Sequence, residues 1–295
     1  MFRRKKFRLR LPSRSLALGQ RTLVMGVLNV TPDSFSDGGL HFSTEGAVAR
    51  ALEIERQGAD ILDIGAESTR PGSSGISAKE ELSRLLPVLA QLRGRLKIPI
   101  SVDTSKSEVA SAAADTGAEI VNDITALRRD PRIAEVARRR RLALILMHMR
   151  GEPQTMQKLP FSRDVLRDVI SGLQRAVATA RRLGVAKSQI LLDPGIGFGK
   201  SYPQNYELLA RLPELGRLGF PLLVGTSRKS FLTRALGDVP ADRRTYGTAA
   251  TVTAAILGGA HIVRVHDVAE MVQVARTVDA LVNPSSIPPQ KARSR

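Results

Sequence analysis

The sequence predicts an α/β protein that folds as a single (β/α)8 TIM barrel. Between residues 22 and 283, short apolar runs alternate eight times with amphipathic segments, and this alternation is typical of parallel strands joined by crossover helices. Polar and glycine-rich residues follow the apolar runs, at the strand ends where a barrel carries its chemistry. The 295 residues suit one barrel plus tails, with an open doubly wound sheet as the alternative.

The apolar runs are short and rich in Ile, Val and Leu, as buried parallel strands are. The predicted strands cover residues 22–28, 61–64, 98–102, 119–121, 142–147, 189–192, 220–224 and 261–265. The predicted helices cover roughly residues 44–58, 78–93, 106–116, 130–140, 163–183, 202–210, 243–258 and 267–282. Because no change in composition marks a second domain, residues 21–283 are expected to form the one barrel domain.

The formal net charge of +17 first suggests nucleic acid or an anionic membrane as a partner. Residues 1–21 hold eight basic and no acidic residues, and residues 284–295 hold three, which leaves +6 on the body. Residues 1–20 and 284–295 are therefore predicted to be basic tails, and deleting residues 1–18 should leave the kinetics unchanged. Aromatic residues make up only 4% and Trp is absent, which argues against specific nucleic-acid binding as the main function.

Other patterns exclude several classes of protein. The absence of Cys rules out disulfides, thiolate metal sites and Cys nucleophiles. No apolar stretch reaches the length of a membrane span, and no apolar core of a secretory signal follows the basic start. That Arg-rich, acid-free start also fits an organelle transit peptide, but we expect a cytoplasmic protein. Nucleotide-binding glycine fingerprints are absent as well.

Two carboxylates and an amide stand at predicted strand ends. Asp103 and Asp193 each follow a buried apolar run, and Asn122 ends another. Their functional interpretation is a set of acceptors for one flat ligand with a planar donor edge. The structural alternatives are a helix N-cap for Asp103 and a turn residue for Asp193.

Two further segments indicate anion binding. Residues 227–230 (SRKS) lie where a strand meets a helix start, and Arg264 and His266 alternate along a strand so that both point to one face. Together they could bind a diphosphate. Lys229 could instead be a solvated surface residue and His266 a structural one, and we expect structural roles for His148 and His261.

The loops over residues 29–39 and 65–77 are rich in Gly, Ser, Thr and Pro. Long loops of this kind at a barrel mouth are typical of mobile lids. No His cluster marks a transition-metal site. Mg²⁺ uses few protein ligands, so a Mg²⁺ ion held by Asn29, Asp37 and substrate phosphates fits the pattern.

Taken in order, these segments resemble the dihydropteroate synthase family, from about Leu23 to Ala280. The matching motifs are residues 25–39 (MGVLNVTPDSFSDGG), 67–72 (ESTRPG), 101–106 (SVDTSK), 121–123 (VND), 146–151 (LMHMRG), 192–200 (LDPGIGFGK), 227–230 (SRKS) and 264–267 (RVHD). Each motif alone is moderately specific, except that the first is long enough to be strongly specific, and the ordered set is more so.

The resemblance implies a transferase of folate biosynthesis that joins (7,8-dihydropterin-6-yl)methyl diphosphate to 4-aminobenzoate by a dissociative, Mg²⁺-assisted mechanism. The implied catalytic residues are Asp103, Asp193, Lys229, Arg264 and Asn29. Implied pterin ligands are Asp103, Asn122, Met147, Asp193 and Lys229, and implied diphosphate ligands are Asn29, Arg264 and His266. The implied aminobenzoate site comprises Phe35, Thr69, Arg70, Pro71, Phe198 and Ser230, with Asn29 and Asp37 as metal ligands.

The resemblance further implies competitive inhibition by sulfonamides and a homodimer, with no membrane or specific nucleic acid as partner. Departures from the family pattern are mild: Ala66 stands where Gly is common, and Ile196 where Phe is frequent. One alternative is a pterin-dependent methyltransferase of the same barrel superfamily, which would not need the diphosphate clamp or the long first loop. Another is an inactive paralogue with an intact site.

Overall fold

The computed structural model of the chain describes residues 4–31, 43–68, 73, 75–152, 155–156 and 161–284. Eight of its strands form one parallel sheet, in which β3 to β8 pair in sequence order, β10 pairs with β3 and β9 pairs with β10. A parallel bridge between Leu192 and Leu222 joins β8 to the segment leading into β9, so the sheet closes into the predicted barrel. The strands are β3 (Leu23–Asn29), β4 (Ile61–Gly65), β5 (Ile100–Asp103), β6 (Ile120–Asp123), β7 (Ala143–Met147), β8 (Ile190–Asp193), β9 (Leu223–Val224) and β10 (Ile262–Val265).

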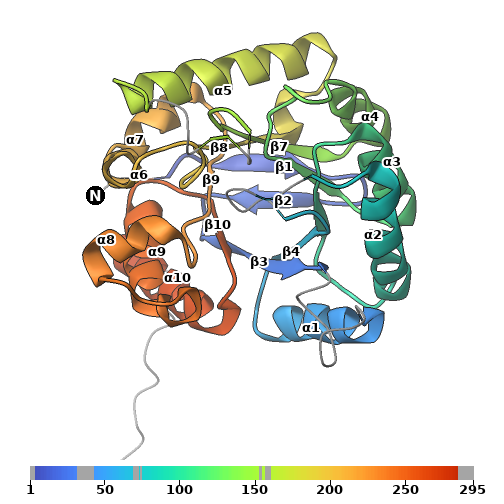
Figure 1. Cartoon of the computed structure of the whole chain (residues 1–295), viewed down its shortest axis with the longest axis horizontal. Coiled ribbons are helices and arrows are strands. Elements are labelled where there is room, and N and C mark those ends of the chain that lie inside the picture. Colours follow the sequence, from blue (N-terminus) through green and yellow to red (C-terminus); the bar gives the residue numbers. More distant parts are fainter. Residues whose placement is uncertain are drawn as a thin grey trace, which may run out of the picture.

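Helices surround the strands (Figure 1). Eight follow the predicted pattern: α1 (Thr44–Arg56), α2 (Ala78–Leu92), α3 (Ser107–Thr116), α4 (Arg132–Arg140), α5 (Val165–Arg182), α6 (Tyr202–Ala210), α9 (Thr245–Leu257) and α10 (Val268–Val282). The single-turn helices α7 (Leu212–Leu215) and α8 (Thr233–Leu236) were not predicted, because one turn is too short to produce a periodic pattern. No described helix is long and apolar enough to cross a bilayer.

β9 is shorter than the predicted strand over residues 220–224. Pro221 lacks a backbone N–H and so cannot donate to a neighbouring strand. Its carbonyl still accepts a hydrogen bond from Leu192 N at 3.0 Å, and Leu222 O accepts one from Ile262 N at 3.1 Å. The backbone around Pro221 therefore still contributes to closing the barrel.

The prediction of a basic tail over residues 1–20 is wrong, because two strands form within it. Deleting residues 1–18 would remove both strands, so the expectation that this deletion leaves the kinetics unchanged no longer holds. β1 (Phe7–Arg10) and β2 (Ser15–Leu18) form an antiparallel hairpin. Its inward residues Leu9, Leu11 and Leu18 are buried against the strand residues that fill the barrel interior: Leu23, Met25, Ile61, Ile120, Ala143, Ile145, Leu191, Leu223 and Ile262. The hairpin thus covers the end of the barrel away from the polar strand ends, and Figure 1 shows it across the middle of the ring.

Several basic residues of this segment also have structural partners. Arg4 is buried, forms an ion pair with Asp279 and donates to Ala260 O at 3.1 Å. Arg14 lies 3.2 Å from Glu119. Apolar and basic residues alternate along residues 7–11 (FRLRL), a period-two pattern typical of a half-buried strand, so the high charge concealed a structural signal. Beyond Pro284, the predicted C-terminal tail lies outside the described residues.

We predict that Leu9→Ala lowers the free energy of unfolding by about 2–5 kcal/mol, because it opens a cavity between hairpin and barrel. Arg8→Ala, which changes an exposed residue on the same strand, should stay within about 0.5 kcal/mol of the unaltered protein. Urea unfolding followed by circular dichroism measures both. Equal, small effects for the two variants would mean that the hairpin does not cover the barrel.

Candidate active site

The inward-facing residues of the strands form layers, because side chains alternate between the two faces of a strand. The layer next to the hairpin is apolar and includes Ile61, Ile120, Ile145, Leu191 and Ile262. Two residues further along the same strands come Asp63, Asn122, Met147, Asp193 and Arg264. The alternation therefore places a ring of mostly polar side chains on an apolar floor, at the carboxyl ends of the strands.

Arg264 bridges carboxylates from two other strands. Its Nε donates to Asp63 Oδ2 at 2.6 Å and its Nη2 donates to Asp103 Oδ2 at 3.1 Å. Asn122 Nδ2 also donates to Asp63 Oδ2, at 3.1 Å. Burial opposes the charge on the Arg264 guanidinium, but the two carboxylates outweigh it and raise its pKa. Strands β4, β5, β6 and β10 are thus tied together at one level.

Asp103 has an unusual protonation equilibrium. Burial raises the pKa of its carboxyl to about 7, with Arg264 opposing the rise and Asp63 adding to it. The helix-cap alternative for Asp103 is not what the structure shows, since the residue before α3 is Lys106. Asp103 therefore faces the barrel interior, as its predicted role requires.

Two buried acceptor atoms in the ring have no hydrogen-bond partner among the described residues. They are Asp63 Oδ1 and Asn122 Oδ1. Unpaired buried acceptors are costly, so the ring is suited to a ligand that supplies hydrogen-bond donors. Asp63 was not predicted as a site residue. Its signal was a single carboxylate inside the apolar run of residues 61–64.

Asp193 and Lys229 each form a hydrogen bond with the glycine-rich turn over residues 195–199. Asp193 Oδ1 accepts a hydrogen bond from Gly195 N at 2.6 Å. Asp193 therefore stabilises the turn, as one alternative expected, and it also faces the barrel interior, as the other expected. Lys229 donates to Ile196 O, and its Nζ lies 4.3 Å from the centre of the Phe198 ring. Burial lowers the pKa of Lys229 to about 8 and raises that of Asp193.

The turn itself requires glycine. Gly197 has φ +86°, and a Cβ there would lie 2.9 Å from Lys229 Cδ. This close approach allows the Lys229 side chain to pass over the turn towards Asp193. Glycine at this position is therefore part of what places the cation.

Lys200 is a fully buried lysine, which sequence reasoning missed. Only 1% of its surface is exposed, and its Nζ donates to Gly195 O at 2.9 Å and Phe198 O at 3.0 Å. It also lies 3.1 Å from His148 Nδ1. Burial lowers the pKa of Lys200 to about 7. Lys200 thus stabilises the glycine-rich turn through its carbonyls, and His148 contacts Lys200. These contacts agree with the structural role expected for His148.

His261 also has the structural contacts that we expected. Its Nδ1 accepts a hydrogen bond from Leu222 N at 3.1 Å, and its Nε2 lies 2.9 Å from Lys5 O. The imidazole therefore connects the N-terminal segment to the backbone just before β9, at the end of the barrel that the hairpin covers. His261 therefore lies at the opposite end of the barrel from the polar strand ends.

The predicted anion-binding segments are close to one another. His266 Nδ1 and backbone N both lie 3.1 Å from Ser227 Oγ. Burial lowers the pKa of His266 to about 3, with Arg264 adding to the effect, so this imidazole is neutral near pH 7. Arg228 turns to form an ion pair with Asp267. Lys229 and Arg264 are therefore the cations of these segments that reach the interior.

The remaining predicted residues divide into two groups. Asn29 is exposed at the end of β3, where its Cα pairs with Gly65, which in turn pairs with Asp103. Ser230 is exposed at the start of a short 3-10 helix. The residues Phe35, Asp37, Thr69, Arg70 and Pro71 lie outside the described part of the chain.

Beside Asp103 the structure has a cavity of about 410 Å³. Its lining runs from Asp103 and Glu67 to Arg128, Arg129 and Met149. An apolar cluster borders the same region and consists of Ile124, Met147, Met149, Met156 and the partly buried Phe198. An apolar wall next to buried hydrogen-bond acceptors suits a flat heteroaromatic ligand.

Comparison with known proteins shows similarity in both sequence and structure. Residues 25–266 match the family described as pterin binding enzyme. A dihydropteroate synthase from Synechocystis sp. is 51% identical over 263 residues, which cover 89% of this chain and 91% of that protein. The structure is similar to a Yersinia pestis dihydropteroate synthase in a sulfonamide complex, with TM-score 0.87, 43% identity, and coverage of 94% and 99%.

It is also similar to a Xanthomonas albilineans dihydropteroate synthase in complex with 7,8-dihydropteroate, with TM-score 0.83, 40% identity, and coverage of 95% of this chain and 100% of that one. The match thus extends over nearly the whole barrel in sequence and in structure. The chain belongs to the pterin-binding enzyme family and, within it, to the dihydropteroate synthases.

Proposed function

We propose that the chain joins (7,8-dihydropterin-6-yl)methyl diphosphate to 4-aminobenzoate, which gives 7,8-dihydropteroate and diphosphate. The observation that carries this proposal is the inward ring of Asp63, Asn122, Asp193 and Arg264 beside an apolar wall. Relatives named dihydropteroate synthase support it, including one solved with 7,8-dihydropteroate. The chain is then a transferase of folate biosynthesis. The methyltransferase alternative loses support, since these relatives are named synthases.

The pterin site follows from the acceptors of the ring. Asp103, Asn122 and Asp193 would accept hydrogen bonds from the donor edge of the pterin, and Lys229 would donate to it. Met147 belongs to the apolar wall and would pack on the ring face. Asp63 has a positioning role, because it holds both Arg264 and Asn122 through one carboxylate oxygen.

The chemistry requires no nucleophile from the protein. The bond between the pterin methylene carbon and the diphosphate oxygen breaks, and its electron pair leaves with the diphosphate. Asp103 and Asp193 would stabilise the positive charge that develops on the pterin. The nitrogen of 4-aminobenzoate then bonds to the methylene carbon, and the amine proton passes to solvent. Phe35, Thr69, Arg70, Pro71, Phe198 and Ser230 are the proposed aminobenzoate site.

Arg264, His266 and Asn29 are the proposed diphosphate ligands. The neutral His266 would act as a hydrogen-bond donor through Nε2, because its Nδ1 is engaged with Ser227. Arg264 would retain its contact with Asp103 and so connect the leaving group to the pterin site. An anion arriving here offsets the cations that lower the pKa of His266.

The family resemblance also implies Mg²⁺, and we propose Asn29 and Asp37 as its ligands. The Asn29 amide oxygen is a hard donor at the mouth, which fits Mg²⁺, while Asp37 lies outside the described residues. No group of three or more His, Cys, Asp or Glu within the described ranges could hold a metal ion. Mg²⁺ needs few protein ligands, so Asn29 and Asp37 would be enough to hold it, and when bound it would neutralise charge on the diphosphate.

We further propose a cytoplasmic homodimer. Helices α9 and α10 lie side by side in Figure 1. Tyr246, Leu257 and Leu281 on them are 88%, 44% and 60% exposed, and exposed large apolar residues favour an interface. Size-exclusion chromatography with light scattering gives the mass in solution, and a mass of one chain would contradict the dimer.

Purified protein supplied with both substrates and Mg²⁺ should form dihydropteroate and release diphosphate in equal amounts. Omitting 4-aminobenzoate should abolish dihydropteroate formation, and chelating Mg²⁺ with EDTA should lower the rate at least about tenfold. Mass spectrometry and a coupled diphosphate assay measure the two products. Absence of dihydropteroate would refute the synthase proposal and favour an inactive paralogue.

The affinity for the pterin should rise with pH through about 7. Below this pH Asp103 carries a proton and cannot accept from the pterin donor edge, so only the ionised fraction binds well. Between about pH 6 and pH 8 the dissociation constant should fall about tenfold. Calorimetric titration with the pterin across this range measures the change.

Asp103→Asn should remove this pH dependence, whereas Asp115→Asn should retain it. Asp115 is the matched control, because it is half exposed and pairs with Arg140 on the surface. An unchanged pH profile in Asp103→Asn would show that another group controls pterin binding.

A further inference from the structure

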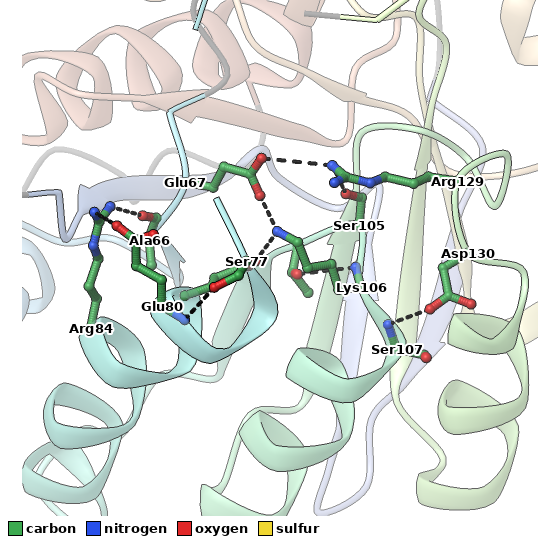
Figure 2. Close-up of polar contacts among 12 residues, drawn as sticks. Ala66, Glu67, Ser77, Glu80, Arg84, Ser105, Lys106, Ser107, Arg129 and Asp130 are labelled. Atoms are coloured by element: carbon green, nitrogen blue, oxygen red, sulfur yellow. Dashed lines mark hydrogen bonds and ion pairs between the residues drawn. The ribbon is translucent and has the colours of Figure 1, made fainter. Parts of the chain in front are cut away.

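Lys200 is buried in an environment that is unusual for a lysine. Buried lysines are normally paired with carboxylates, and Figure 2 shows such a case, in which the largely buried Lys106 points to Glu67. The Lys200 nitrogen is instead surrounded by three backbone carbonyl oxygens and one imidazole nitrogen. A cation among carbonyl oxygens holds backbone in place, so the question is which backbone Lys200 holds.

The contacts of Lys200 join two segments that follow neighbouring strands. Gly195 O and Phe198 O accept hydrogen bonds from its Nζ at 2.9 and 3.0 Å, and both belong to the glycine-rich turn after β8. His148 O, just after β7, accepts a third at 3.2 Å. The two segments are packed closely, because Gly195 has φ +66° and a Cβ there would collide with His148 O. Lys200 therefore holds the turn against the end of β7.

The same turn contacts two proposed pterin ligands. Gly195 N donates to Asp193 Oδ1 at 2.6 Å. The Phe198 ring centre lies 4.3 Å from Lys229 Nζ, which also donates to a carbonyl of the turn. Each of the two turn residues whose carbonyls Lys200 binds is therefore in contact with one of these ligands. A displaced turn would move both.

Electrostatic attraction strengthens the link between Lys200 and Asp193. Burial raises the pKa of Asp193, and the Lys200 cation is among the groups that oppose this rise. Asp193 in turn opposes the effect of burial, which lowers the pKa of Lys200 to about 7. Ionised carboxylates are the forms that accept hydrogen bonds from a donor edge. Lys200 thus favours the form of Asp193 that pterin binding requires.

We propose that Lys200 is a positioning residue for the pterin: it holds two carbonyl groups of the glycine-rich turn and thereby fixes Asp193 and Lys229. This inference rests on the proposed function, which makes those two residues pterin ligands. It gives Lys200 no contact with either substrate. The effect of Lys200 should therefore be confined to the part of the site that the turn supports.

The test is Lys200→Met, with the binding of two probes measured by calorimetry. The pterin probe is 6-hydroxymethyl-7,8-dihydropterin, which lacks the diphosphate, and the second probe is inorganic diphosphate with Mg²⁺. The dissociation constant of the pterin should rise on the order of tenfold, because small displacements of positioning groups are costly. That of diphosphate should change less than about twofold, since its proposed ligands come from the ends of β3 and β10.

Lys187→Met is the matched control. Lys187 is exposed and lies just before β8, the strand that ends at Asp193. Its removal should leave both dissociation constants unchanged. Urea unfolding measures the stability of both variants. Lys200→Met should fold, because Gly195 O keeps the hydrogen bond that it accepts from Phe198 N at 3.1 Å.

Nitrogen-15 NMR of lysine side chains in the unaltered chain gives a second measurement, for which no variant has to fold. Saturation with the pterin probe should shift the Lys200 Nζ signal, because the turn and Asp193 respond to the ligand. Saturation with diphosphate should leave that signal in place. The signal of the exposed Lys187 should stay unchanged with both probes.

An unchanged pterin dissociation constant in folded Lys200→Met would overturn the inference. Equal losses for pterin and diphosphate would overturn it too, because they would indicate a general structural defect. If the variant does not fold, a Lys200 signal that the pterin leaves unmoved would have the same consequence. Both probes are measured without turnover, so a chain that forms no dihydropteroate would refute the proposed function and leave this test intact.

Discussion

The pairing of Arg264 with Asp63 and Asp103 is the interaction on which the rest of the site depends. Without the guanidinium, two buried carboxylates would face each other in a barrel interior where unpaired charge is costly. With it, β4, β5 and β10 are held at one level, and Asp63 can also hold Asn122. The same pairing keeps the pKa of Asp103 near 7, rather than higher. Structure and protonation are therefore controlled by one cation.

This charged layer is stable because the neighbouring layer of barrel residues, next to the hairpin, is apolar and shielded from water. The apolar floor of the barrel would be open to solvent at its far end if the N-terminal hairpin did not cover it with Leu9 and Leu18. An apolar layer that excludes water lowers the local dielectric constant and so strengthens the electrostatic interactions in the charged layer next to it. The hairpin lies far from the proposed chemistry, and it supports that chemistry by excluding water. Exclusion of water also strengthens the hydrogen bond that the buried Lys200 donates to Gly195 O in the glycine-rich turn.

Most of the barrel could be predicted from sequence, because alternating apolar and amphipathic segments are long-range signals that survive small errors in boundaries. Asp103 and Asp193 could be predicted because each ends an apolar run. Asp63 could not, since it lies inside such a run and only the closed barrel shows that it points inward. Lys200 was missed because its partners are backbone carbonyls, which leave no sequence pattern. Leu9 was missed because the surrounding arginines suggested a solvated tail.

The central claim is that Arg264 controls the protonation of a buried carboxylate at the heart of the site. Carbon-13 NMR of the protein with labelled aspartate carboxyl groups measures this directly, in the unaltered chain and in Arg264→Met. The account predicts that Asp103 titrates near pH 7 in the unaltered chain, and that its pKa rises by about one to three units in the variant. A carboxyl group that titrates near pH 4 in both proteins would contradict it.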